Sequence, residues 1–244
     1  MVKFNWEKKG LIFKPSSDHP WIKSHAQCPF TLIFDNFVRV FFSTRGNGDE
    51  NNQFVSQTGY VDLDRNDLTN IIDVSSEPII ALGERGCFDE FGSMAGSIIE
   101  HNEQYYLYYC GWQRSVSTPY NWQIGLGIGD GKSFERYSSG PIIGSHFNEP
   151  YLQACPIVYK LPGDEWHMFY LSGVKWIEND ARMESQYLIM HASSSDGIYW
   201  HRNGKPIIPS RVKDECQTSP SIFEKDGNYH MIFSYRHGED FREN

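Results

Sequence analysis

The sequence has no apolar run long enough to cross a membrane. A membrane-spanning helix needs about 20 predominantly apolar residues, and every apolar run in this chain is much shorter. The opening residues, MVKFNWEKKG, also lack the apolar core of a signal peptide. These absences exclude a membrane-spanning helix and predict a protein that is not exported.

Closely spaced cysteine pairs are missing as well. The five cysteines are Cys28, Cys87, Cys110, Cys155 and Cys216. An odd count without a secretion signal predicts reduced thiols and a cytoplasmic location. A zinc cluster would need short CxxC or HxxxH spacings, which do not occur. We therefore expect no metal and no cofactor.

Basic residues are fewer than acidic ones. The chain has 22 Lys and Arg against 31 Asp and Glu, for a net charge of −9. This balance argues against nucleic acid and anionic membranes as partners. Aromatic residues, in contrast, make up 15% of the chain. An acidic, aromatic-rich protein suits neutral or basic polar ligands, among them carbohydrate.

Helical periodicity is almost absent, and one β-rich pattern returns four times. The copies begin at Pro29, Gly96, Pro156 and Pro220. Each copy contains two apolar runs joined by turn residues such as Asp35-Asn36 or Asp226-Gly227. Further strand-like segments follow each of the first three copies. Four antiparallel strands in each unit of about 60 residues are typical of a β-propeller blade.

The predicted fold is therefore an all-β propeller with four-stranded antiparallel blades, forming a single domain over residues 1–244. The segment 6–16 resembles the last strand of a blade, as expected if the ends of a ring lock together. The predicted units are an outer strand at 6–16, blade 1 at about 24–83, blade 2 at about 90–145, blade 3 at about 149–210 and a partial blade 4 at about 214–244.

A ring of five such blades needs about 300 residues. We therefore expect the chain to be truncated within the fourth blade. The alternative is completion by a second molecule, because open strand edges seek partners. The open edges thus predict self-association.

Hairpin geometry brings the start of each inner strand next to the end of the strand that follows. Carboxylates, amides, arginines and tryptophans occupy these places and are expected to share one face of the propeller. Loop residues on a rigid scaffold commonly bind ligands or catalyse. The candidate catalytic residues are Asp89, Glu149 and Glu215, and the candidate substrate-binding residues are His25, Gln27, Arg45, Trp112, Gln153, Trp176 and Arg236.

This composition suits a sugar. Indole faces cover the apolar faces of a pyranose, and amides and carboxylates pair with its hydroxyl groups. Arginines suit an anionic group. Each residue also has a structural alternative: the carboxylates as loop or turn residues, the arginines as salt-bridge partners between blades, the tryptophans as core residues and His25 as a hydrogen-bonding neighbour.

The phrases SHAQCP, FDEFGSMAGSI, YLYYCGW, EPYLQACPIV and SYR, with the turn from Ser194 to Trp200, resemble the five-bladed propeller glycosidases. This superfamily includes the arabinosidase/xylosidase and invertase/fructosidase families and the mannoside phosphorylases. The chain is most similar to uncharacterised members associated with bacterial surface-polysaccharide gene clusters. The resemblance implies a carbohydrate-active enzyme.

The chain departs from the superfamily pattern at the acids. Those glycosidases usually place an aspartate directly before the first-blade proline, and here that residue is Cys28. Asp89 is the nearest counterpart of the second-blade aspartate, and Glu149 corresponds to the third-blade general acid. The resemblance thus leaves open whether the acids have moved or the chain binds sugar without cleaving it.

The sequence predicts a glycoside hydrolase that acts on a bacterial polysaccharide or oligosaccharide. Glu149 is the expected general acid and Asp89 its carboxylate partner. One alternative is a phosphorylase whose phosphate is held by Arg45 and Arg236. Another is a non-catalytic glycan-binding propeller, and a third is a scaffold for other proteins.

Overall fold

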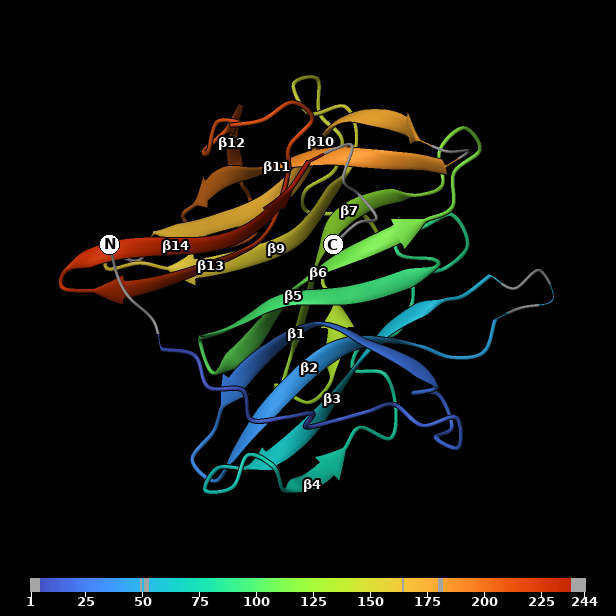
Figure 1. The fold of residues 1–244 in the computed structure, drawn as a ribbon, viewed down its shortest axis with the longest axis vertical. Helices are drawn as coiled ribbons and strands as arrows, with labels where there is room; N and C mark the ends of the chain where they lie inside the picture. The colour runs from blue at the N-terminus through green and yellow to red at the C-terminus, as the bar shows by residue number, and fades with distance from the viewer. Residues whose placement is uncertain (1–4, 49, 51–52, 164, 180–181, 238–244) are drawn as a thin grey trace.

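The structure, a computed structural model, contains β-strands and no helix among the residues that it describes (5–48, 50, 53–163, 165–179 and 182–237). Within these residues, no helix could cross a membrane. The described strands form an eight-stranded sheet, a four-stranded sheet and a hairpin (Figure 1). The eight-stranded sheet consists of two four-stranded units whose described strands are joined only by the parallel pairing of Ser56 with Gly92. The all-β prediction is confirmed.

Each four-stranded unit, which we call a blade, corresponds to one copy of the sequence repeat, and the hairpin corresponds to the fourth copy. Blade 1 contains β1 (Ser24–Ile33), β2 (Phe37–Arg45), β3 (Ser56–Asp64) and β4 (Ile71–Val74). Blade 2 contains β5 (Gly92–His101), β6 (Gln104–Gln113), β7 (Asn121–Gly129) and β8 (Phe134–Arg136). Blade 3 contains β9 (Gln153–Lys160), β10 (Trp166–Asn179), β11 (Arg182–Ser194) and β12 (His201–Pro206). The hairpin consists of β13 (Cys216–Lys225) and β14 (Asn228–Arg236).

The repeated proline marks a bulge in the inner strand. Cys28, Cys155 and Ser219 each precede a proline and have φ values of 51°, 48° and 54°. The pairing register shifts at the same places. Proline has no N–H to donate to a ladder, so a bulge is where a strand tolerates it. The repeat in the sequence is therefore the repeat of this bulge.

Blade 2 has Gly96 where the other copies have proline, and its register also shifts there. A Cβ at Gly96 would lie 2.3 Å from the carbonyl oxygen of Pro156 in the next inner strand. Glycine is therefore required at this position, because neighbouring inner strands approach each other closely near the axis.

The core lies between the blades. Phe41 and Tyr60 of blade 1 pack with Tyr109 of blade 2 in one cluster. Tyr108 of blade 2 packs with the fully buried Trp166 of blade 3 in a second cluster. Because apolar burial is the main favourable term in folding, each blade is stabilised by its neighbours.

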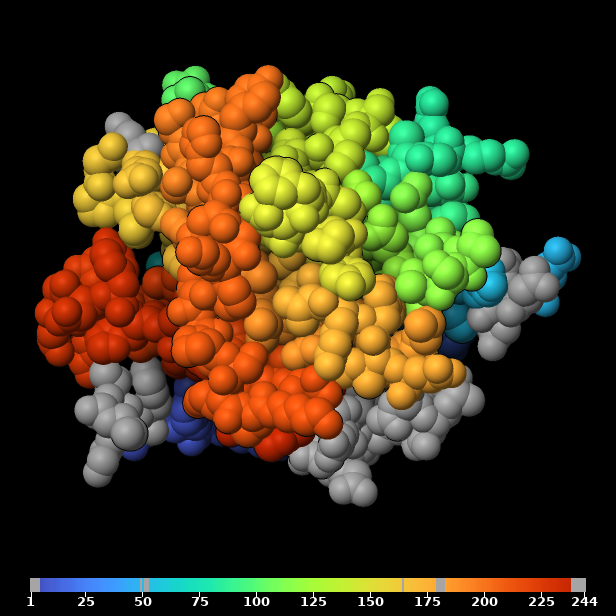
Figure 2. Space-filling model, turned by 90° about the horizontal axis from the view of Figure 1, so that it is seen from above, coloured from blue at the N-terminus to red at the C-terminus, as the bar shows by residue number. Residues whose placement is uncertain are grey.

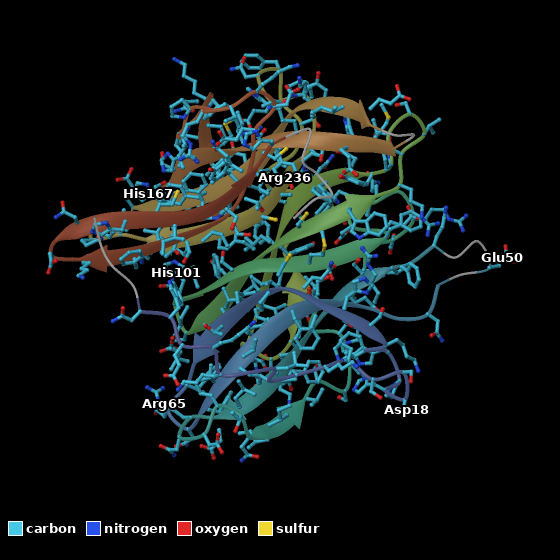
Figure 3. The ribbon with its side chains drawn as sticks, viewed as in Figure 1. Asp18, Glu50, Arg65, His101, His167 and Arg236 are labelled. Carbon is cyan, nitrogen blue, oxygen red and sulfur yellow. The ribbon has the colours of Figure 1, made fainter. Side chains whose placement is uncertain are left out.

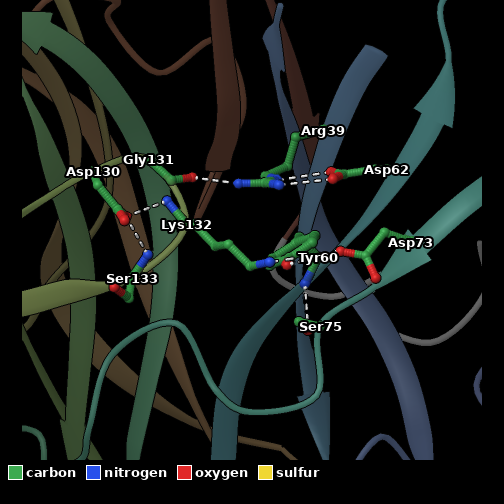
Figure 4. Close-up of polar contacts among 9 residues, drawn as sticks. All are labelled: Arg39, Tyr60, Asp62, Asp73, Ser75, Asp130, Gly131, Lys132 and Ser133. Atoms are coloured by element: carbon green, nitrogen blue, oxygen red, sulfur yellow. Dashed lines mark hydrogen bonds and ion pairs between the residues drawn. The ribbon is translucent and has the colours of Figure 1, made fainter. Parts of the chain in front are cut away.

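One buried arginine also joins two blades at the turn end (Figure 4). Arg39 of β2 donates two hydrogen bonds of 2.7 Å to the carboxylate of Asp62 on β3. Its third nitrogen donates to the carbonyl oxygen of Gly131, in the β7–β8 turn of blade 2, at 2.8 Å. The guanidinium also lies 3.9 Å from the ring centre of Tyr60. One side chain thus fastens blade 1 to blade 2.

The turn SSSDGIYW (193–200) has a structural role. The Ser194 hydroxyl accepts hydrogen bonds from the backbone N–H groups of Asp196 and Gly197. Tyr108 of blade 2 donates to the carbonyl oxygen of Gly197 at 2.9 Å. Trp200 packs edge-on against the same tyrosine. The turn therefore joins blade 3 to blade 2.

The segment 6–16 was predicted as an outer strand and forms no strand. A strand needs a hydrogen-bonded neighbour, and no ladder among the described residues includes this segment. Phe13 nevertheless packs on Phe42 of β2, with 5.1 Å between ring centres. The blade limits and the blade count of five stay predictions.

Candidate functional site

The blades have two different ends. We call the mouth the end at which the inner strands β1, β5, β9 and β13 begin and β2, β6, β10 and β14 finish. Figure 3 shows Arg65, His101 and His167 at the opposite, turn-bearing end, whereas Asp18 and Glu50 lie at the mouth end. The hairpin geometry expected from the repeat is thus present.

The longest hairpin of the chain extends the mouth. Strands β10 and β11 have 14 and 13 residues, against 10 and 9 for β6 and β7 of blade 2. We call residues 174–179 and 182–187, at the mouth end of this hairpin, the arm. The arm lies beside the β6–β7 connection (Figure 2). Lys175 on the arm forms an ion pair with Asp214, in the connection before β13.

The arm forms an aromatic surface with blade 2. The ring of Trp176 lies 5.2 Å from that of Tyr120, and Tyr120 stacks on Trp122 at 4.4 Å. The Tyr120 hydroxyl is 3.1 Å from the hydroxyl of Ser185. Burial raises the pKa of Tyr120. This surface therefore presents neutral aromatic rings with a hydroxyl pair at their edge.

Blade 4 adds a cation to this surface. The guanidinium of Arg236, at the end of β14, lies 5.9 Å from the ring centre of Tyr187 on the arm. Burial raises the pKa of Tyr187, and Arg236 opposes that shift. The structure thus brings together Trp176 and Arg236, two of the predicted binding residues, through Tyr120 and Tyr187.

An axial cavity of about 530 Å³ lies between the inner strands. Its walls include Cys28, Met94, Cys155 and Ser221, one residue from each of β1, β5, β9 and β13. The described residues that line it include no Asp, Glu, Lys, Arg or His. Nor do the described residues contain a group of His, Cys, Asp and Glu suited to hold a metal ion.

The predicted catalytic residue Asp89 is fully buried within blade 2. The Tyr109 hydroxyl of β6 donates to its Oδ2 at 2.8 Å. Arg136, the last residue of β8, donates to its Oδ1 at 3.2 Å. Burial raises the pKa of Tyr109, and the neighbouring Asp89 carboxylate raises it further. Tyr109 is therefore a permanent hydrogen-bond donor to Asp89.

Glu149 has the same partners in blade 3 and is 1% exposed. The Tyr170 hydroxyl of β10 lies 3.0 and 2.9 Å from its two carboxylate oxygens. Arg202 of β12 lies 3.8 Å from Oε2. Both carboxylate oxygens of Glu149 thus face the phenol of Tyr170, and the guanidinium of Arg202 is close by. The side chain is held inside its blade rather than presented to the mouth.

Blade 1 fills the corresponding place with apolar side chains. Ile22 lies seven residues before Pro29, as Asp89 and Glu149 lie seven residues before Gly96 and Pro156. Ile22 is fully buried and packs with Phe42 of β2. The position seven residues before the repeat anchor is thus apolar in blade 1 and a carboxylate bound to tyrosine and arginine in blades 2 and 3. This pattern points to a packing role that the position shares in all three blades.

Glu215 is buried in the connection before β13. Gln217 donates to its Oε1 at 2.9 Å, and the backbone N–H of Arg211 donates to its Oε2 at 2.7 Å. Burial alone would raise the pKa of Glu215, but these hydrogen bonds lower it below its ordinary value. Glu215 is therefore a carboxylate rather than a proton donor.

The predicted binding residues of blade 1 are accessible. His25 and Gln27 are exposed on β1, and the His25 ring contacts the Ser24 hydroxyl at 2.9 Å. Arg45 is half-buried at the end of β2, with its guanidinium 5.9 Å from the Phe54 ring. None of the described contacts joins these residues to the aromatic surface of the arm.

Trp112 and Gln153 have partners within their blades. A Cβ at Gly92 would lie 1.8 Å from the Trp112 indole nitrogen, so this indole covers the backbone of β5. Gln153 is fully buried and donates to the Glu149 carbonyl oxygen at 3.1 Å. Sequence reasoning missed Tyr120, Trp122 and Tyr187. They lie in the β6–β7 connection, at the start of β7 and on the arm, outside the repeated strand ends that the sequence analysis followed.

No protein-family model matches the chain. It is 33% identical over 234 residues to the uncharacterized protein Rv1502 of Mycobacterium tuberculosis, covering 95% of this chain and 76% of that protein. It is also 28% identical over 92 residues to a beta-1,2-mannobiose phosphorylase of Thermoanaerobacter, covering 35% of this chain and 30% of the phosphorylase.

Solved structures share the fold at low identity. The protein BT0996, solved as a complex with RGII, superimposes with a TM-score of 0.65 at 15% identity, over 90% of this chain and 70% of BT0996. The Bombyx mori GH32 beta-fructofuranosidase BmSUC1 gives 0.61 at 18% identity, over 87% and 42%. The fold is thus that of the propeller glycosidases, and the chain belongs to the family of the mycobacterial protein Rv1502.

Proposed function

We propose that the protein is a carbohydrate-active enzyme of the propeller glycosidase type that binds its sugar at the mouth. The observation that carries this proposal is the aromatic surface of Trp176, Tyr120 and Trp122, next to the cation of Arg236. It lies on a fold shared with glycoside hydrolases over most of the chain.

The chemistry of this surface matches a sugar. Aromatic rings are suited to the C–H faces of a pyranose, and the hydroxyl of the half-buried Tyr120, which is held by the buried Ser185, offers a hydrogen bond at the ring edge. A guanidinium recognises a carboxylate or phosphate through paired hydrogen bonds. The proposed substrate is a bacterial polysaccharide or oligosaccharide, with an anionic group near Arg236.

The catalytic roles of Glu149, Asp89 and Glu215 stay predictions. Hydrolysis needs two carboxyl groups, one of them protonated, on either side of the scissile bond. The three carboxylates are buried and hydrogen-bonded in their own blades. A catalytic role for Glu149 therefore requires a rearrangement that exposes its carboxylate and weakens the contact with Tyr170.

Two other functions are supported by particular observations. Phosphorolysis is supported by the partial identity to a beta-1,2-mannobiose phosphorylase. It would also need only one proton donor, because phosphate itself is the nucleophile. Glycan binding without cleavage is supported by the axial cavity, whose described lining has no carboxylate.

We also propose a five-bladed ring, a cytoplasmic location with reduced cysteines, and self-association through open strand edges such as that of β14.

A mutational comparison with the purified chain tests the proposal. The protein is incubated with aryl glycosides and β-1,2-mannobiose, with and without phosphate, and products are measured by mass spectrometry. Free sugar without phosphate indicates hydrolysis, and a sugar phosphate indicates phosphorolysis. Glycan binding by calorimetry without either product indicates a binding propeller. Absence of both binding and product for every glycan would contradict the proposal.

A further inference from the structure

The ion pair of Lys175 and Asp214 lies at the mouth, between the arm and the connection before β13. The Lys175 side chain is 46% exposed and that of Asp214 is 19% exposed. Lys175 is also the sequence neighbour of Trp176, which belongs to the aromatic surface. An ion pair this accessible contributes little to stability, because water screens it. Lys175 can therefore exchange Asp214 for another anion at a small cost in free energy.

Of the two partners, Asp214 is the one fixed in place. Its backbone has a φ of 55°, in the left-handed region that residues other than glycine seldom adopt. Its neighbour Glu215 is buried and receives hydrogen bonds from Gln217 and from the backbone of Arg211. The lysine ammonium, in contrast, ends a long flexible stem. An exchange of partners would thus move Lys175 and leave Asp214 where it is.

A second cation borders the same short segment. Arg236 is the ladder partner of Cys216, which follows Asp214 by two residues. The Cys216 thiol lies 3.8 Å from the carbonyl oxygen of Ser185 on the arm. Residues 214–216 therefore lie along the arm, with Lys175 contacting their start and Arg236 paired to their end.

The aromatic groups around Arg236 are neutral. Burial raises the pKa of Tyr187 and of Tyr120, and the charge of Arg236 opposes both shifts. The guanidinium thus acts on both phenols, which keep their protons at neutral pH. A guanidinium next to neutral hydroxyl groups is suited to a carboxylate or phosphate, which it binds through paired hydrogen bonds.

We propose that Lys175 is the residue by which the mouth selects an acidic glycan. When the carboxylate or phosphate of a bound sugar lies next to Arg236, the Lys175 ammonium leaves Asp214 and pairs with that group. Without the ligand, Asp214 holds the ammonium at the edge of the site. The inference rests on the proposed function for the binding of a glycan at the mouth, and it adds the residue that decides in favour of an acidic one.

The test compares neutral and acidic sugars of the same shape. The probes are the methyl glycosides of glucose and mannose, the corresponding uronates and the corresponding 6-phosphates, measured with the whole chain by calorimetry at low and high salt. At least one acidic probe should bind about tenfold tighter than its neutral counterpart, because hydrogen bonds between charged groups are the stronger ones. High salt should reduce this preference. The uronates and the phosphates show which anionic group is recognised. Equal affinities for every neutral and acidic pair would overturn the proposal.

Two variants of the ion pair should act in opposite directions. Lys175→Met should lower the preference for the acidic probe about tenfold, because it removes the cation. Asp214→Asn should raise the preference, because it releases Lys175 and removes a repelling carboxylate, and asparagine tolerates the left-handed backbone. Both variants break the same ion pair, so a merely structural role would shift both in the same direction. That result would overturn the proposal. Lys132→Met, which removes an equal charge at the turn end, is the control and should leave the preference unchanged.

The outcomes separate this inference from the function proposed above. Turnover of glycans without any preference for an acidic probe would support the proposed function and overturn the inference. Binding of an acidic probe that depends on Lys175 but not on Trp176, in a chain without turnover, would support the inference and contradict the proposed enzyme. If none of the acidic probes binds to the folded wild-type chain, the inference is wrong.

Discussion

The hydroxyl of Tyr170 lies 3.0 and 2.9 Å from the two carboxylate oxygens of Glu149, and both residues are buried in blade 3. Tyr109 and Asp89 form the same contact in blade 2, at 2.8 Å. Because the same donor is bound to a carboxylate in two blades, the structural cost of removing it can be measured in blade 2 and compared with blade 3, which carries the expected general acid Glu149.

Tyr170→Phe and Tyr109→Phe are expected to destabilise the protein to a similar extent. Each removes the donor to a buried carboxylate, which costs about 1–3 kcal/mol. Urea unfolding followed by fluorescence measures this free energy. A Tyr170→Phe variant of wild-type stability that has lost its turnover would contradict the shared packing role and support catalysis by Glu149.

Arg39→Met is expected to lower the free energy of unfolding by about 3–5 kcal/mol, because it leaves the Asp62 carboxylate buried without its partner. The double variant Arg39→Met with Asp62→Leu should recover much of this loss. The exposed pair of Lys132 and Asp73, 3.9 Å apart, is the control (Figure 4). Lys132→Met should cost less than about 1 kcal/mol. Equal costs for Arg39→Met and Lys132→Met would contradict the larger stabilising role of the buried pair.

Trp176→Ala is expected to weaken glycan binding by about tenfold or more, equivalent to about 1.4 kcal/mol, because it removes the ring that lies against Tyr120. Tyr199→Ala is the matched control, since Tyr199 is 73% exposed in the turn after β11, away from the arm. Calorimetry with the tightest-binding glycan measures both variants. Equal effects of the two substitutions would exclude the arm from the sugar site.

Lowering the pH is expected to decrease the free energy of unfolding through protonation of His191. Its ring nitrogen lies 2.9 Å from His167, and burial followed by the charge of His167 lowers its pKa. The unfolded chain therefore takes up this proton first, so the stability is complete above about pH 6.5 and falls as the pH decreases below that value. Thermal unfolding between pH 7.5 and 5 should show this decrease. His191→Gln should flatten it, and an unchanged decrease would assign the effect to other groups.

The fold was predictable because its signal is local and repeated. The spacing of the copies already indicated where the inner strands run, and the structure adds a bulge at the residue before each proline, such as Cys28 or Cys155. The segment 6–16 was misjudged because its likeness to a last strand does not supply a neighbouring strand. The roles of individual carboxylates were harder to predict from the sequence. Whether Glu149 faces solvent or Tyr170 depends on packing between strands that are distant in sequence.

The most direct test of the account is the cleavage of glycosides by the purified protein, compared with the Trp176→Ala variant. We expect release of a sugar, or of a sugar phosphate when phosphate is present, from at least one glycoside, together with a large loss of product in the variant. No product and no binding across the whole panel, in a protein that is folded by circular dichroism, would contradict it.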